Sequence, residues 1–200
     1  LRSGELIDGF SPFLTDPEAN LEFPAQEEQE RTEAWLAAKL GLSERDGLGE
    51  LSDEMRTDGR WRRGQTLWRL GMTEDVRSEL QSLMRYKQDE ALASYQLALS
   101  YRDLGYYYGA LRSARNSLDA LGQTNPVEAP QFISHLRYGP YYQDLIVPAS
   151  QAYGLDPRLV YAVVRQESLF QGTVVSAAYA QGLMQIIPAT GDWIATQIAW

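Results

Sequence analysis

The chain has 200 residues, of which 44% are hydrophobic, and its formal net charge is −9. It contains no Cys and one His, His135, which excludes thiol nucleophiles, disulfides and His-pair metal sites and disfavours a Ser–His triad. Because thiol chemistry is excluded and imidazole chemistry is disfavoured, we expect any catalysis to depend on carboxylates, with no metal and no cofactor. The acidic balance argues against nucleic-acid binding.

Residues 1–30 are predicted to form an acidic extended arm. They contain Pro12, Pro17 and Pro24 and little periodicity, and residues 1–50 hold twelve Asp and Glu against four Lys and Arg. No run of about 18 apolar residues predicts a membrane span, and the start lacks the layout of a signal peptide. Because the chain opens without Met and stops inside an apolar stretch, we expect it to be a piece of a longer precursor.

Residues 31–134 are predicted to form an α-helical solenoid, because apolar residues recur there at spacings of three and four. The pair Leu-Gly occurs at 40–41, 70–71 and 104–105, at intervals of 30 and 34 residues. The second interval is the tetratricopeptide period, and the pattern resembles tetratricopeptide-like hairpins in which Trp68 and the Tyr run 106–108 pack between helices. Generic helical hairpins with Gly at the helix ends are the alternative.

Residues 122–143 are rich in Pro and Gly and are interpreted as a linker or irregular crossover. We place the domain boundary near residue 135, which leaves residues 135–200 as a second domain. Tyr138, Tyr141 and Tyr142 in this region are candidates for a binding platform, or they pack against the solenoid.

The pair Asp156-Pro157 predicts a helix start, because Asp caps free N–H groups and Pro fits the first turn. The helix is expected to reach about Leu169, with one buried stripe formed by Val160, Val163, Val164 and Glu167. A carboxylate on that stripe would lose hydration, which raises its pKa and suits a general acid. The alternative is a Glu in the last turn that reaches solvent or pairs with an Arg.

An ordered set of residues follows this helix: Glu167-Ser168-Leu169-Phe170, Ser176, Ala178, Ala180, Gly182-Leu183-Met184-Gln185 and Pro188-Ala189-Thr190-Gly191. This set resembles the soluble lytic transglycosylase family, whose fold is lysozyme-like, over roughly residues 140–200. The resemblance implies an all-α protein in which the helical-hairpin solenoid precedes the N-terminal part of a lysozyme-like domain.

The resemblance also implies roles for individual residues. Glu167 would be the catalytic acid/base, and Ser168 would orient it or touch a sugar N-acetyl group. Gln185 and Met184 would face the glycan groove. Two of these residues have simpler alternatives, since Ser168 could cap the helix end and Met184 could belong to the core.

The chain departs from the family pattern at Tyr179 and at Ile187, where members often have Met, a volume-conserving change that should be tolerated. Tyr179 stands where the pattern has Gly, so either the local turn differs or Tyr179 lines the sugar site. Family members also continue past this point with helices that close the groove, which are absent from these 200 residues, so the fragment by itself is expected to be incomplete.

The activity implied by the resemblance is cleavage of peptidoglycan strands between N-acetylmuramic acid and N-acetylglucosamine, with a 1,6-anhydro product. A lysozyme-type hydrolase with Asp192 as second carboxylate is one alternative. A non-catalytic scaffold that binds the cell-wall glycan or assembles other components, with the solenoid as its working part, is the other. Under any of these interpretations, the solenoid is the candidate surface for a protein partner. Peptidoglycan as substrate implies an extracytoplasmic bacterial setting.

Overall fold

The computed structural model describes residues 21, 26–43, 47–123, 125 and 128–198. The regular elements within these ranges are all helices, with two isolated β-bridges and no strand. The chain divides into two compact units, one of residues 23–139 and one that contains residues 140–200. The all-α prediction is confirmed. None of the helices in the described ranges is long and apolar enough to cross a membrane.

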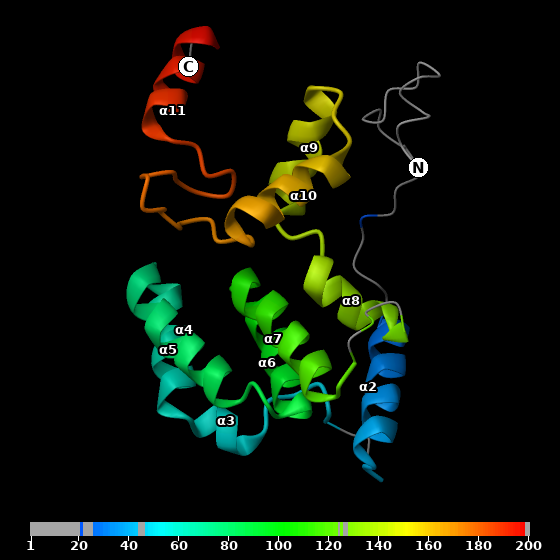
Figure 1. The fold of residues 1–200 in the computed structure, drawn as a ribbon. Helices are drawn as coiled ribbons and strands as arrows, with labels where there is room; N and C mark the ends of the chain where they lie inside the picture. Colours follow the sequence, from blue (N-terminus) through cyan, green and yellow to red (C-terminus); the bar gives the residue numbers. More distant parts are fainter. Residues whose placement is uncertain (1–20, 22–25, 44–46, 124, 126–127, 199–200) are drawn as a thin grey trace, which may run out of the picture. The chain divides into compact units, whose positions relative to one another are not determined.

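The first unit is built from helical hairpins (Figure 1). Helix α4 packs on α5, and α6 packs on α7. Gly71 and Gly105 make the two hairpin turns in the left-handed conformation, with φ of 72° and 82°, which costs little for a residue without a Cβ. The unit comprises α2 (Gln26–Leu40), α3 (Asp53–Thr57), α4 (Gly59–Arg69), α5 (Thr73–Tyr86), α6 (Ala91–Leu104), α7 (Tyr107–Ala120) and α8 (Gln131–Tyr138).

Aromatic side chains pack between these hairpins as the sequence predicts. The ring centroids of Trp68 and Tyr106 lie 5.4 Å apart in an edge-to-face arrangement. Tyr106 also meets Tyr101 edge-to-face at 5.4 Å, so rings from α4, α6 and the start of α7 form one connected cluster. Such pairs add to the free energy gained from burial itself.

Helix α8 corrects the predicted linker and boundary. Its residues Phe132, Ile133 and Leu136 are buried in one core cluster with α2, α6 and α7, because an amphipathic helix must cover its apolar face. The two units divide after residue 139 rather than near 135. At the other end, α2 already begins at Gln26, so residues 26–30 are helical and not part of an extended arm; residues 1–20 and 22–25 lie outside the described residues.

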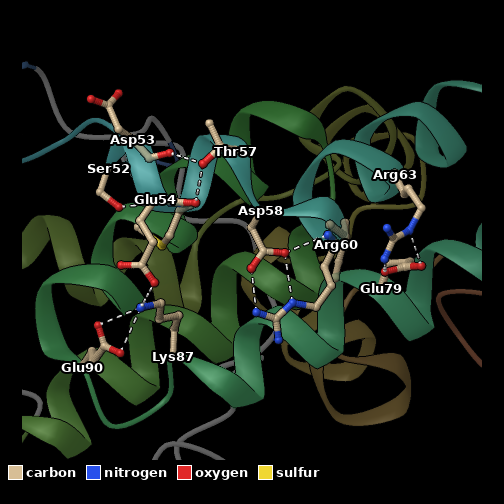
Figure 2. Close-up of polar contacts among 12 residues, drawn as sticks. Ser52, Asp53, Glu54, Thr57, Asp58, Arg60, Arg63, Glu79, Lys87 and Glu90 are labelled. Carbon is tan, nitrogen blue, oxygen red and sulfur yellow. Dashed lines mark hydrogen bonds and ion pairs between the residues drawn. The ribbon is translucent and has the colours of Figure 1, made fainter.

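A buried cation ties α3 to the α5–α6 turn (Figure 2). The Lys87 side chain is only 6% exposed, and its Nζ donates to Glu54 at 2.9 Å and to Glu90 at 3.1 Å. Burial by itself lowers the pKa of Lys87, but the hydrogen bonds to Glu54 and Glu90 outweigh it, so the pKa is raised overall. The charged form of Lys87 is therefore favoured by folding.

The second unit contains α9 (Gln143–Ala152), α10 (Pro157–Ser168) and α11 (Pro188–Gln197). Helices α9 and α10 pack on each other, and residues 169–187 run between α10 and α11 without regular structure. The predicted start of α10 is confirmed, since Asp156 caps the helix by accepting a hydrogen bond from the Arg158 N–H at 2.8 Å. The predicted end is confirmed to within one residue.

We predict that Gly64→Ala destabilises the first unit by about 1–2 kcal/mol despite the better helix propensity of Ala. A Cβ at Gly64 would meet Leu80 Cγ at 2.7 Å, and Leu80 is fully buried where α4 crosses α5. Chemical denaturation measures the loss. Thr66→Ala on the exposed face of α4 is the control, and equal stability of the two variants would contradict a close helix crossing.

The raised pKa of Lys87 predicts a loss of stability at high pH. Its contribution is fully present below the unfolded-state pKa of about 10.4 and is lost as pH rises through the folded-state value. The stability difference between the native chain and Lys87→Met should therefore shrink above about pH 10. Lys39→Met, which removes an exposed Lys on α2, should show no such trend in the same denaturation series.

Candidate active site

Helix α10 places Glu167 in its last turn, but not on the buried stripe that the sequence predicted. The buried residues of α10 are Pro157, Val164 and Ser168, and Glu167 is exposed. The stripe therefore runs through Ser168, one residue or about 100° around the helix from Glu167. The prediction of a buried, desolvated carboxylate is wrong for the described structure, and the carboxyl group is open to solvent.

Ser168 takes the interior position instead. Its side chain is 4% exposed, and its hydroxyl donates to the Val164 carbonyl at 3.0 Å. This bond to the carbonyl four residues earlier satisfies a buried hydroxyl and closes the last turn of α10. The geometry supports the helix-end alternative for Ser168.

The chain leaves α10 through two consecutive left-handed residues. Leu169 has φ of 50° and Phe170 has φ of 62°. Gln171 then returns to the helix end, donating to the Ser168 carbonyl from both its backbone N–H and its Nε2 at 3.1 Å. A left-handed conformation costs about 1–2 kcal/mol for a residue with a Cβ, so the exit from α10 is a strained segment.

Among the described residues, strain of this kind occurs in the second unit and not in the first. The non-Gly residues with positive φ in the described structure are Tyr142, Leu169, Phe170, Tyr179 and Gln185. In the described part of residues 23–139, by contrast, every residue with positive φ is a Gly. Strained backbone is common at functional sites, so the segment after Glu167 is a candidate for the site.

Ser176 is the centre of the first turn in this segment. Its hydroxyl accepts hydrogen bonds from the Ala178 and Ala180 N–H groups, at 3.3 and 3.1 Å. Its carbonyl accepts from the Tyr179 N–H at 2.9 Å, and Tyr179 itself has φ of 62°. The turn thus has a left-handed residue where the family pattern has Gly, and the Tyr179 ring is 71% exposed.

Gln185 organises the second turn. Its Nε2 donates to the Val174 carbonyl at 3.2 Å and to the Gly182 carbonyl at 2.9 Å, which uses both amide protons. Only Oε1 remains available, so Gln185 could contact a ligand as an acceptor. Gln185, predicted from the resemblance to face the groove, therefore has a structural role, because its side chain links the backbone at residues 174 and 182.

The outer surface of this segment and α11 is rich in apolar side chains. Met184 is 41% exposed, which does not fit the core alternative considered for it, and Trp193 on α11 is 63% exposed. Trp193 is not among the site residues predicted from the sequence. The exposed members of this surface are Val175, Tyr179, Met184, Ile186, Ile187, Trp193 and Ile198.

Tyr161 is half-buried, and its hydroxyl lies inside the second unit. Burial, with a smaller effect from the charge of Asp144, raises the pKa of Tyr161 to about 12. Its hydroxyl has no hydrogen-bond partner among the described residues. Within the same ranges, no cluster of three His, Asp or Glu side chains could hold a metal ion.

The segment that holds this site is similar to segments of known proteins. Residues 144–199 match the family described as Transglycosylase SLT domain. Two membrane-bound lytic murein transglycosylases C are similar to the chain: that of Haemophilus influenzae is 37% identical over 65 residues, or 32% of this chain and 18% of the relative. That of Mannheimia succiniciproducens is 41% identical over 49 residues, or 24% and 14%.

Solved structures show a similar fold over most of the chain. An inactive mutant of the lytic transglycosylase Slt from Pseudomonas aeruginosa matches 100% of this chain and 31% of its own, with a TM-score of 0.59 and 20% identity. The 70-kDa soluble lytic transglycosylase from Escherichia coli matches 87% of this chain and 28% of its own, with a TM-score of 0.60 and 18% identity.

The described residues form an all-α fold that is similar to those of the solved lytic transglycosylases. More particularly, the chain carries a Transglycosylase SLT domain over residues 144–199, which includes Glu167 and the strained segment after it. The chain spans less than a fifth of the curated relatives and less than a third of the solved chains that it matches.

We predict that Tyr179→Gly stabilises the protein by about 1 kcal/mol, because Gly adopts the left-handed conformation without the Cβ penalty. The gain is expected even though an aromatic ring is removed, since that ring is largely exposed. Thermal unfolding measures it, and Ala178→Gly in the same turn is the control, which should destabilise. A lower melting temperature for Tyr179→Gly would contradict a strained turn.

Proposed function

We propose that the full-length protein is a lytic transglycosylase that cleaves the β-1,4 bond between N-acetylmuramic acid and N-acetylglucosamine in peptidoglycan. The observation that carries the proposal is the position of Glu167, an exposed carboxyl in the last turn of a capped helix within the segment that matches the SLT domain. The relatives are named as lytic murein transglycosylases, and the same activity is proposed here.

In the proposed reaction, one carboxyl group serves both proton transfers. Protonated Glu167 gives its proton to the oxygen that bridges the two sugars, and the bond from that oxygen to C1 of the muramic residue breaks. The Glu167 carboxylate then accepts the proton of the C6 hydroxyl as O6 bonds to C1. The product is a 1,6-anhydro sugar, no water is consumed, and Glu167 ends protonated as it began.

Other residues of the segment would contact the glycan. Exposed Tyr179 and Met184 offer apolar surface to sugar rings, and Oε1 of Gln185 would accept from a hydroxyl or amide group. Ser168 would act mainly from within, by fixing the turn that presents Glu167. Peptidoglycan as substrate places the protein outside the cytoplasm of a bacterium.

A lysozyme-type hydrolase is the second candidate, since Asp192 supplies a further exposed carboxyl group on α11. Such an enzyme would use a second carboxylate as base or nucleophile and would add water to the product. A cell-wall scaffold, with the helical hairpins as the binding part, is the non-enzymatic candidate. Product identity separates these three functions.

We predict that Glu167→Gln lowers turnover by about 10²- to 10⁴-fold and leaves glycan binding intact, because it removes the proton donor but keeps the side-chain shape. Mass spectrometry of muropeptides released from purified peptidoglycan is the measurement, since an anhydro product is one water lighter than a hydrolysed one. Asp192→Asn is the matched control and should release anhydro products at the native rate.

Two outcomes would overturn the transglycosylase proposal. Hydrated products that vanish in both variants would favour the hydrolase. Intact binding to peptidoglycan with no release of muropeptides by the native full-length protein would favour the scaffold.

A further inference from the structure

The ring of Phe170 is the anchor of the strained exit from α10. Phe170 is 3% exposed, and its ring meets that of Tyr141 edge-to-face, with centroids 5.4 Å apart and planes at 77°. On another side it meets the ring of Tyr161 on α10 at 6.4 Å. Of the two left-handed residues after α10, Phe170 has the larger φ, and its ring is held by two aromatic neighbours.

Tyr141 is itself a fixed partner rather than a surface platform. It is 3% exposed and lies just before α9, next to Tyr142, which has φ of 56° at the N-cap of that helix. The three rings of Tyr141, Tyr161 and Phe170 thus join the entry of α9, the middle of α10 and the exit of α10. We call these three side chains the aromatic clasp.

The conformation that the clasp holds differs from the ordinary end of a helix. Leu169 is the C-cap of α10, and its N–H donates to the Arg165 carbonyl at 3.1 Å. Without an anchor, residues with a Cβ at positions 169 and 170 would leave the left-handed region and the last turn would open or extend. Glu167 lies in that turn, so its direction depends on the clasp.

We propose that Phe170 is a positioning residue for Glu167, and that the aromatic clasp acts by keeping Leu169 and Phe170 left-handed. The inference rests on the proposed function for its kinetic consequence, but its structural part stands by itself. Phe170 has no polar group and would not take part in proton transfer. Its effect would come through the placement of the carboxyl group.

The test compares Phe170→Ala with the native full-length protein, assayed well below the unfolding temperature of both. Loss of the clasp should lower kcat for release of anhydromuropeptides by about 10- to 100-fold, because small misplacements of an acid are costly, and should leave KM nearly unchanged. Ile146→Ala, which removes a buried side chain of α9 in the same unit, is the control for lost stability.

Leu169→Gly supplies the rescue that a merely structural role would not give. Gly favours the left-handed C-cap, so adding Leu169→Gly to Phe170→Ala should restore part of kcat although the core cavity remains. Tyr161→Phe keeps the ring and removes only an unpartnered hydroxyl, so it should leave kcat unchanged. An equal fall in kcat for Ile146→Ala and Phe170→Ala, with no rescue, would overturn the proposal.

Hydrogen exchange separates failure of this inference from failure of the proposed function. The amides of Leu169 and Gln171, which donate to Arg165 and Ser168, should lose protection in Phe170→Ala and keep it in Ile146→Ala. If the native protein releases no muropeptides but this pattern is seen, the clasp stands and the proposed activity falls. Unchanged protection in Phe170→Ala would refute the clasp whatever the activity.

Discussion

The left-handed exit of α10 is the constraint on which the candidate site depends. Two consecutive residues with a Cβ, Leu169 and Phe170, cost about 2–4 kcal/mol in that conformation. Burial of the Phe170 ring contributes about 1.5–3 kcal/mol, and two aromatic contacts add about 0.5–1.5 kcal/mol each. The two sides are of similar size, so the turn persists only while its anchor is packed.

The two units differ in which residues adopt the left-handed conformation. In the hairpin unit Gly71 and Gly105 are left-handed, and they lie where the chain reverses direction and no side-chain contact is needed. The second unit also has Gly154 and Gly182 in this conformation, but it adds residues with side chains that make further contacts. Among them, Gln185 Nε2 donates to two carbonyls, and Phe170 fills the interior. A left-handed residue with a side chain persists where the contacts of that side chain stabilise the fold by more than the conformational strain costs.

Local signals in the sequence predicted much of this architecture. Burial that depends on residues far away in the sequence was not predicted. The start of α10 follows from Asp156-Pro157, and the hairpin turns follow from Gly, because caps and left-handed Gly act within a few residues. Helix α8 was taken as linker because its flanking Pro and Gly dominate the local composition, whereas its buried face is visible only against α2, α6 and α7. Tyr141 was interpreted as a platform or a solenoid contact for the same reason, since its partner Phe170 lies 29 residues away.

The error about Glu167 shows what the site requires of its helix. The apolar pattern of α10 fits two stripes one residue apart, and periodicity cannot choose between them when both contain Val164. In the structure the buried stripe runs through Ser168, because the Ser168 hydroxyl donates to a carbonyl of its own helix. A buried carboxylate at position 167 would have no such partner within the helix. The same choice turns Glu167 outward, where a glycan oxygen could reach it. Ser168 therefore allows the last turn of α10 to pack against the interior while the neighbouring Glu167 stays exposed.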